Sequence, residues 1–551
     1  MTILTSIQQR QDEIITRIAT AAYAQPIMSN GFLFEGDVRD NFYYASYLFA
    51  ASVDSAITFE GDRTAAKDKA ERIFHHLLEI QDQNPASETY GHWPLNLRPT
   101  PQEASKNTLP VELMGSLMVY FAQRYQEQLS DALREAFETS IRHIYNSNFY
   151  RKPVTYFGHH EAKYTAAKLI FGQRYGDEAL VADGYESLRL TLARIKEHGM
   201  TEYGGLPWFW HWVQAFTCAW QLIEDGEIRH ELSRMLDYLW NERATFYLGG
   251  AWVGPHARIW PHDMPKDTNV LHDYVQFGDF QLPDHMPRTE YAGFLVYEAP
   301  LASRQKALHR AEPVEIKRQI PKQIGTAVHE KDFLHSYVYL TESFAMGGMW
   351  ERIREFDNEQ HRWDVAFPLD TTQEGVNHAY FFHPDVEQPE GDLRHQSEYT
   401  EVLFHENVIM ASYAIPDDQP AYIKGCLPLG EWVEEPHGLF GRVGEVYMAV
   451  YIQQAYDREV LDDRIFVTSR GRANAVVVEC VDQVMAASYG ISDVHHFADR
   501  MKSKQPQYVP NNEISYTSLS QQTLLLASGP NQEISRLINE IPIDWSSYTV
   551  A

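Results

Sequence analysis

The chain has 551 residues, of which 44% are hydrophobic and 13% aromatic, enough to bury a large core and more than one domain usually holds. Its formal net charge of −29 disfavours long-range attraction to nucleic acid or to an anionic membrane surface. We therefore expect neither partner, and we expect any anionic substrate to be small or to be held by a local basic pocket.

The first residues and the cysteines favour a cytoplasmic protein. Residues 1–13 lack the apolar core of a signal peptide, and no later stretch approaches the ~18 apolar residues of a membrane helix. Cys218, Cys426 and Cys480 are odd in number and far apart, which predicts buried free thiols. The oligomeric state stays open.

Residues from about 4 to 250 follow the period of successive amphipathic helices, with apolar side chains every three to four positions. Short polar connections between them favour antiparallel neighbours. About five or six such hairpins would curl into an α/α toroid, incomplete or closed. The predicted helices cover residues 41–55, 65–81, 110–125, 130–145, 160–175, 178–198, 207–223 and 228–240.

From about residue 290 the pattern changes to short β-rich runs separated by Gly, Pro, Asn and Asp. One helix, at 493–503, interrupts them. We predict an α+β multidomain protein: an α/α toroid over 1–250, an ordered linker over 251–290 and an antiparallel β-sandwich over 291–551. The predicted strands cover residues 291–297, 336–341, 363–367, 379–382, 408–413, 446–452 and 475–481.

Two adjacent histidines stand at the predicted start of one helix. Gly158 precedes His159 and His160, and Lys163 and Tyr164 follow four positions later on the same faces. The positive end of the helix dipole disfavours imidazolium, so a neutral histidine here can act as a base or a hydrogen-bond donor. The alternative is one structural and one surface histidine.

A second candidate segment is a glycine-rich loop that leads into an aromatic helix. Tyr203 lies on this loop, and a proline suited to the first helical turn follows. Trp208 and Trp212 are four positions apart, with His211 beside them, which suits a platform for sugar rings. The alternative is that these aromatic side chains fill contacts between inner helices of the toroid.

Further candidate ligands for a substrate lie at similar turns. His256 and Arg258 follow a Gly-Pro turn, and the guanidinium of Arg258 could grip a carboxylate or form an interdomain salt bridge. Asn107 and Glu112 stand where a loop enters a helix. Because such loops converge in toroids, we expect these residues to face one cleft.

The Gly-His-His helix start and the later Gly-x-x-Glu-Tyr-Gly loop resemble the Asn-His helix and the Gly-Ser-Tyr loop of heparinase- and alginate-lyase-like enzymes, which join a toroid to a β-sandwich. The Glu-Tyr loop and Gly-Pro-His-Ala-Arg are more similar to a poorly characterised branch of toroid proteins. The resemblance implies that His159 or His160 neutralises the substrate carboxylate or takes the proton, and that Tyr203 is the catalytic tyrosine.

The chain departs from that pattern at two places. His159 stands where the lyases have Asn, and the β half lacks their His-Gly-His-x-Asp run, for which His378 is a partial substitute. His361, His383 and His395 show no ligand spacing, so we expect no metal. Walker, dinucleotide-binding and Gly-x-Ser-x-Gly motifs are absent from the sequence, so we expect no cofactor.

These observations predict a cytoplasmic lyase that cleaves a short uronate-containing oligosaccharide by β-elimination. The C5 proton becomes acidic when a cation or hydrogen-bond donor neutralises the adjacent carboxylate. Arg258, Lys163 or a histidine could do this, and Tyr203 could protonate the leaving oxygen.

Three alternatives stay open. One is a glycoside hydrolase, which needs two opposed carboxylates from among Asp37, Asp40, Glu112 and Glu202. Another is a cyclase or isomerase of specialised metabolism on the same fold. The last is a carbohydrate-binding protein without enzymatic activity.

Overall fold

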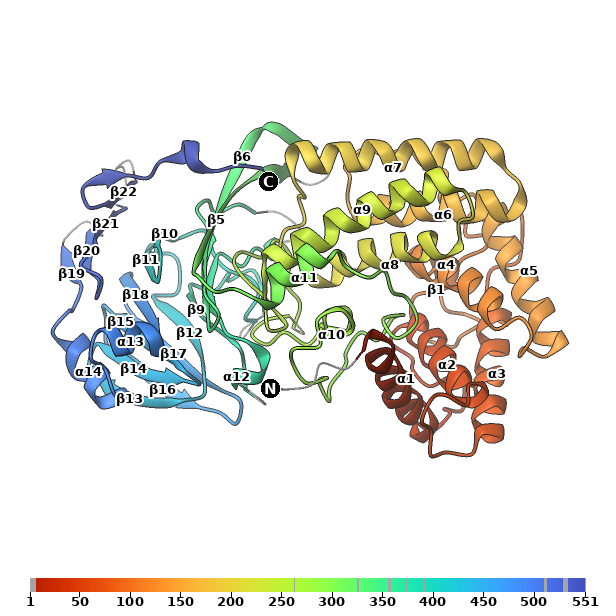
Figure 1. Cartoon of the computed structure of the whole chain (residues 1–551), viewed down its shortest axis with the longest axis horizontal. Coiled ribbons are helices and arrows are strands. Elements are labelled where there is room, and N and C mark those ends of the chain that lie inside the picture. The colour runs from red at the N-terminus through yellow and green to blue at the C-terminus, as the bar shows by residue number, and fades with distance from the viewer. Residues whose placement is uncertain are drawn as a thin grey trace.

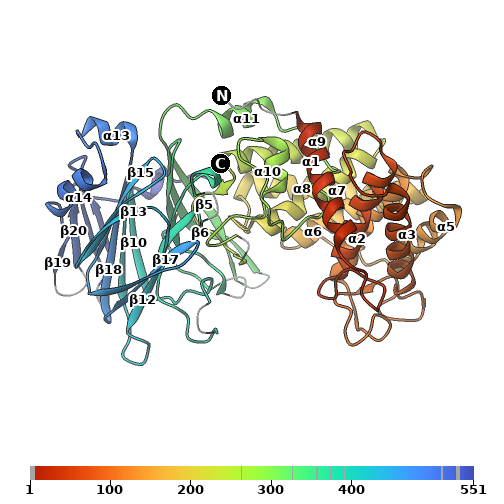
Figure 2. The same ribbon diagram turned by 90° about the horizontal axis from the view of Figure 1, so that it is seen from below.

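The computed structural model describes residues 6–261, 263–324, 327–354, 358–372, 375–389, 392–509, 513–528 and 534–550. Helices fill one half of the elongated molecule and antiparallel sheets fill the other (Figure 1). The perpendicular view in Figure 2 shows the same division. The predicted α+β class, helical first and β-rich second, is confirmed.

The helical half contains two layers. The inner helices α2, α4, α6 and α8 contact one another in that order, while α3, α5, α7 and α9 pack outside them. The inner helices α4, α6 and α8 bury nearly every side chain, whereas the outer helix α5 buries a single stripe. This difference is expected, because an inner helix is covered on both sides and an outer helix on one side. The helices are α1 (Ile7–Ala24), α2 (Val38–Val53), α3 (Arg63–Glu79), α4 (Leu109–Arg124), α5 (Asp131–Ser147), α6 (His159–Tyr175), α7 (Glu178–His198), α8 (Leu206–Leu222) and α9 (Gly226–Thr245).

The helix ends follow from local chemistry. Gly176 closes α6 at φ +65°, a left-handed conformation that glycine adopts readily. The carboxylate of Asp177 then accepts the backbone N–H of Leu180 at 3.0 Å and caps α7. The helix predicted for 178–198 therefore coincides with α7, and the other predicted helices agree within a few residues.

Two large antiparallel sheets and one small one make up the β half. The first runs β16-β17-β12-β9-β8-β7-β6-β5, with β5 (Val314–Ile324), β6 (Ala327–Leu340), β7 (Ala345–Met349), β8 (Trp363–Ala366), β9 (His378–Phe382), β12 (Tyr422–Pro428), β16 (Tyr456–Val460) and β17 (Arg464–Arg470). The second runs β10-β11-β18-β15-β14-β13, with β10 (Thr400–His405), β11 (Val408–Ala414), β13 (Glu431–Glu435), β14 (Gly438–Val443), β15 (Val446–Ile452) and β18 (Ala473–Asp482). The third contains β19 (Gln507–Val509), β20 (Glu513–Thr517), β21 (Thr523–Ala527), β22 (Ser535–Ile538) and β23 (Ile541–Pro542).

Side chains from the two large sheets share one apolar core, which is the arrangement of a β-sandwich. The central strands β15 and β18 are buried along nearly their whole length. Helix α14 (Val494–Lys502) packs on β14 and β15, so the helix predicted at 493–503 is confirmed. A shorter helix, α13 (Gln483–Ser488), precedes it, and α12 (Leu369–Thr372) lies between β8 and β9.

The strand predicted for 291–297 is wrong. These residues form turns and irregular backbone that enter the helical core. The ring of Tyr291 stacks on Phe42 at 5.7 Å, and its hydroxyl lies 2.6 Å from the hydroxyl of Ser46. A short apolar run has the same appearance in a strand and in a core-filling loop, and its long-range contacts decide between them.

Residues 249–261 and 263–288 are largely buried. They include β4 (Ala251–Trp252), paired with β3 (Tyr247–Leu248), and helix α10 (Leu271–Gln276). The buried guanidinium of Arg243 forms an ion pair with Asp273 at 2.8 Å, which attaches this segment to α9. The domain boundaries at 250 and 290 stay a prediction.

Two smaller elements complete the helical half: α11 (Leu301–Leu308) packs on α9, and β1 (Trp93–Pro94) pairs with β2 (Lys106–Asn107). The three cysteines are buried and unpaired, as predicted. Within the described ranges, every helix is too short or too polar to span a membrane.

Candidate functional site

The start of α6 is shaped by a carboxylate inside its first turn. Glu161 accepts the backbone N–H groups of residues 155–157 at 2.6 to 3.3 Å, which folds the preceding loop back onto the helix. Gly158 then occupies the N-cap position in an extended conformation. His159 and His160 consequently stand in the first turn, as predicted.

His160 is held by a buried carboxylate of α4. Its Nδ1 lies 2.7 Å from Oε2 of Glu112, and Nζ of Lys163 lies 2.6 Å from the same oxygen. The hydroxyl of Tyr164 donates to the other oxygen at 2.7 Å. A carboxylate only accepts hydrogen bonds, so Nδ1 carries a proton and Nε2 is the ring nitrogen left free of Glu112. The His160 side chain is 30% exposed.

The charge of Glu112 is stabilised by these donors. Burial opposes ionisation, but Lys163 and the hydrogen bond from His160 outweigh it and hold the pKa of Glu112 well below its usual range. His160 and Tyr164 therefore lie on the same face of α6, as predicted, since both side chains contact Glu112. Lys163, predicted to bind substrate, is buried against this carboxylate.

His159 is held by a second carboxylate, from the loop before α8. Its Nδ1 lies 2.6 Å from Oε1 of Glu202, and its backbone N–H donates to Oε2 at 3.0 Å. The His159 side chain is only 5% exposed. Burial lowers its pKa to about 3, an effect that Glu202 only partly offsets. His159 is thus neutral and enclosed, and His160 is the histidine that reaches the surface.

Arg258 lies beside the same carboxylate. Its guanidinium stacks 4.2 Å from the ring centroid of Trp208 and reaches Oε1 of Glu202 at 3.8 Å. Its Nε is 3.9 Å from Oε2 of Glu359 in the β half. Arg258 therefore joins the helical half to the β half, and 20% of its side chain is exposed. Its role in gripping a substrate carboxylate stays a prediction.

His211 connects the cluster to a third acid. Its Nε2 accepts from Nη2 of Arg288 at 3.1 Å, and Arg288 also binds Glu290 at 2.9 Å. The rings of His211 and His159 are 5.5 Å apart. Burial, together with the nearby charge of Lys163, lowers the pKa of His211 well below its ordinary value, so this imidazole is also neutral.

The predicted aromatic platform divides in two. Trp208 lies against Arg258 and is 5.9 Å from Trp260, whose side chain is 38% exposed. Trp212 is 1% exposed and packs 6.1 Å from Phe216 in the core. Core packing, the alternative prediction, therefore describes Trp212, whereas the ring of Trp208 lies 6.1 Å from that of His159.

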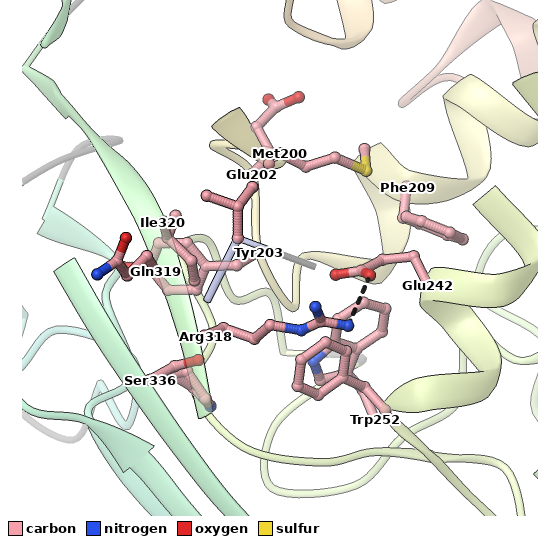
Figure 3. A pocket seen from close by; sticks show the side chains of 14 residues that line it. Met200, Glu202, Tyr203, Phe209, Glu242, Trp252, Arg318, Gln319, Ile320 and Ser336 are labelled. Carbon is pink, nitrogen blue, oxygen red and sulfur yellow. Dashed lines mark ion pairs between the residues drawn. The ribbon is translucent and has the colours of Figure 1, made fainter. Parts of the chain in front are cut away.

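Tyr203 points toward the β half. Its hydroxyl accepts from Nε2 of Gln360 at 2.9 Å. It lines a pocket between the helices and β5 and β6, where Glu242 and Arg318 face each other at 3.8 Å (Figure 3). The neighbouring Glu202 contacts His159. A catalytic role for Tyr203 stays a prediction.

Asn107 and His256 have structural contacts. Oδ1 of Asn107 accepts the backbone N–H of Leu109 at 2.8 Å, at the start of α4. His256 is fully buried, and its Nδ1 donates to the carbonyl of Gly204 at 2.7 Å. Their predicted roles in substrate binding are untested.

His256 belongs to a second histidine cluster, at the junction with the sandwich. With Asp364 of β8 and His378 of β9 it forms a group that could hold a metal ion. His378 lies between two carboxylates, 2.7 Å from Asp364 and 2.6 Å from Asp267. Burial alone would lower the pKa of His378, but Asp267 and Asp364 raise it to about 10.

Comparison with known proteins finds similar solved structures but no similar sequence. No family model matches the chain, and no curated protein is similar to it in sequence. It is similar to heparinase III, at 11% identity and a TM-score of 0.45 over 97% of this chain and 91% of that one.

Two further solved structures are similar. One is a chondroitinase AC lyase, at 8% identity and a TM-score of 0.47 over 98% of this chain and 99% of that one. The other is the chondroitin AC lyase of Streptomyces coelicolor A3, at 10% identity and a TM-score of 0.45 over 94% and 85%.

Proposed function

We propose that this chain is a carbohydrate lyase that cleaves a short uronate-containing oligosaccharide by β-elimination. The observation that carries the proposal is the pair of imidazoles at the start of α6. Each donates Nδ1–H to a buried carboxylate, which orients the ring and leaves Nε2 as the basic atom. Of the two histidines, His160 is the one whose side chain is exposed at the surface.

The reaction needs a base, a group that neutralises the carboxylate and an acid. Arg258 neutralises the uronate carboxylate and stabilises the enediolate as the C5–H bond breaks. Nε2 of His160 takes that proton, and the ionised Glu112 stabilises the imidazolium that forms. The C4–O bond then breaks, the C4–C5 double bond forms, and the leaving oxygen receives a proton from Tyr203.

Neighbouring groups support these roles. Lys163 keeps Glu112 ionised, so the carboxylate stays an acceptor for His160. Gln360 donates to the phenol oxygen of Tyr203, which directs its O–H toward another acceptor. The exposed ring of Trp260, 5.9 Å from Trp208, offers an apolar face for a sugar.

The net charge of −29 favours short substrates over long polyanions, which the chain would repel. The three buried, unpaired cysteines support the cytoplasmic location that we propose with this activity.

The test is incubation of the purified, folded chain with a panel of uronate oligosaccharides that differ in sugar and linkage. We expect the absorbance of a 4,5-unsaturated product to appear with at least one member. Silence across the panel, with folding verified by circular dichroism, would overturn the proposal. Binding without turnover would instead identify a carbohydrate-binding protein.

One observation favours a second candidate, a glycoside hydrolase. Burial and the nearby charge of Asp37 raise the pKa of Asp40 to about 7, so this carboxyl can donate a proton near neutrality. Glu112 cannot, since its pKa is held low. The same panel separates the two functions, because hydrolysis releases a new reducing end without an unsaturated product.

A further inference from the structure

An arginine and a glutamate face each other across a small pocket, too far apart for a hydrogen bond. Nη2 of Arg318, on β5, lies 3.8 Å from Oε2 of Glu242, on α9 (Figure 3). The buried Nε of Arg318 has no hydrogen-bond partner within the described ranges. The same holds for the buried Oγ of Ser336, which stands opposite Arg318 on β6. All three side chains line the pocket, so hydrogen-bonding capacity is left unused there.

The remaining walls of this pocket are mostly apolar. They include the side chains of Phe209, Phe246, Trp252 and Ile320. The volume open to water-sized groups is ≈30 Å³, and about 10–15 Å³ holds one water molecule. Arg318 and Glu242 show 12% and 23% of their side chains to solvent, so small solutes can reach them. The pocket therefore accommodates a molecule of a few heavy atoms that has one polar and one apolar end.

The charges around the pocket favour an anion. Burial raises the pKa of Glu242 above its ordinary value, and the charges of Arg318 and Lys306 only partly oppose this. A protonated carboxyl donates an O–H, so Glu242 can serve as a donor beside the cationic Arg318. Burial also raises the pKa of the neighbouring Tyr238, with a contribution from Glu242, so this phenol is neutral.

We propose that this pocket binds a small monocarboxylate of about two to four carbon atoms through Arg318. A planar guanidinium binds a carboxylate through two parallel hydrogen bonds, and the unpartnered Nε of Arg318 supplies one of them. Protonated Glu242 and Oγ of Ser336 donate to the same ligand oxygens. The alkyl end packs against the apolar walls, which a phosphate or sulfate ion could not use.

An occupant would act on the candidate site through a shared loop. Met200 and Tyr203 line the pocket, and Glu202 of the same loop holds Nδ1 of His159 at 2.6 Å. The described residues that line the pocket do not include Arg258, the proposed ligand of the substrate carboxylate. A bound monocarboxylate would therefore join α9 to β5 and stabilise this loop, as an effector distinct from the substrate.

The experiment measures binding to the full chain, independently of any activity. The purified chain is titrated by calorimetry with acetate, propionate and butyrate, and with propionamide as an uncharged isostere. We expect one carboxylate per chain, a Tm that rises with its concentration and no binding of propionamide. Arg318→Gln should weaken binding at least ~10-fold, because the charged fork is lost.

Two controls change other arginines. Arg470→Gln alters an exposed residue of β17, and Arg258→Gln removes the other proposed carboxylate ligand. Both variants should bind propionate as the unchanged chain does. Loss of binding in Arg258→Gln, with Arg318→Gln unaffected, would assign the carboxylate to the candidate site and overturn the proposal.

The pH dependence decides if Arg318→Gln does not fold. Because the ligand binds beside protonated Glu242, its affinity should fall as pH rises from about 6 to 9, a range in which a small carboxylic acid stays ionised. Glu242→Gln keeps a donor but cannot ionise, so its affinity should change less with pH. Equal pH profiles for the two chains overturn the proposal, as does an unchanged chain that binds none of the carboxylates. The pocket would then hold water alone.

Discussion

The two histidine clusters use the same residue types and reach opposite charge states. In the cluster at the start of α6, His159 faces one carboxylate and has Lys163 and His160 nearby, and burial lowers its pKa to about 3. In the cluster at the junction, His378 lies between two carboxylates that outweigh burial and raise its pKa to about 10. The number of acids around a buried imidazole therefore decides its charge.

This difference assigns separate roles to the clusters. His160 lies at the surface, with 30% of its side chain exposed, which suits the base that we propose. An imidazolium enclosed by two carboxylates has no lone pair to offer a substrate, and it joins separate parts of the fold instead. The proposed base and the buried ion-pair cluster can therefore be tested independently.

The largest expected effect comes from removing the proposed base. His160→Gln keeps a hydrogen-bond donor for Glu112 but loses the basic Nε2, so formation of unsaturated product should fall ~10²–10⁴-fold. Initial rates by absorbance measure this. The control His495→Gln changes an exposed histidine on α14 and should retain full activity. A His160→Gln variant with the unchanged rate would remove this residue from the mechanism.

Removing a carboxylate from the buried cluster should reduce stability instead. Asp364→Asn breaks a fully buried ion pair with His378, which should cost about 3–5 kcal/mol of unfolding free energy. Urea unfolding measures this. Asp457→Asn breaks an exposed pair with Arg470 and should cost at most about 1 kcal/mol. Equal costs for the two variants would contradict the comparison.

Arg258→Lys examines the proposed carboxylate contact. A lysine keeps the charge but loses the planar fork that binds a carboxylate through two hydrogen bonds. One lost charge-assisted bond is worth about 1.5–3 kcal/mol, so kcat/KM should fall about tenfold to a hundredfold. Arg470→Lys is the matched surface control. Unchanged kinetics of Arg258→Lys would place the uronate elsewhere.

The smallest effect, counted per pH unit, is a pH dependence of stability from His159. Its pKa is lowered to about 3 in the folded chain and is about 6.5 when unfolded, so the unfolded state binds more protons between these values. Stability should therefore fall as pH drops below about 6.5, by about 1.4 kcal/mol per pH unit. Urea unfolding of the chain and of His159→Gln measures the difference. Parallel pH profiles would show that His159 is not the titrating group.

Much of the architecture follows from local sequence signals. The apolar period of three to four residues predicts the helices, and Gly176 with Asp177 predicts one of their junctions closely. The runs at 446–452 and 475–481 coincide with or lie within β15 and β18. Hydrogen bonding and burial within one helix or strand depend on neighbours in sequence, so composition and spacing suffice to predict them.

The sequence by itself thus determined the two-part α+β plan and the place of His159 and His160 at a helix start. Only the tertiary structure decided that Glu112 and Glu202 hold these histidines, that residues 291–297 fill the helical core, and that His256 meets His378. These contacts join segments far apart in sequence. They depend on how layers and sheets pack, and local periodicity carries no information about that packing.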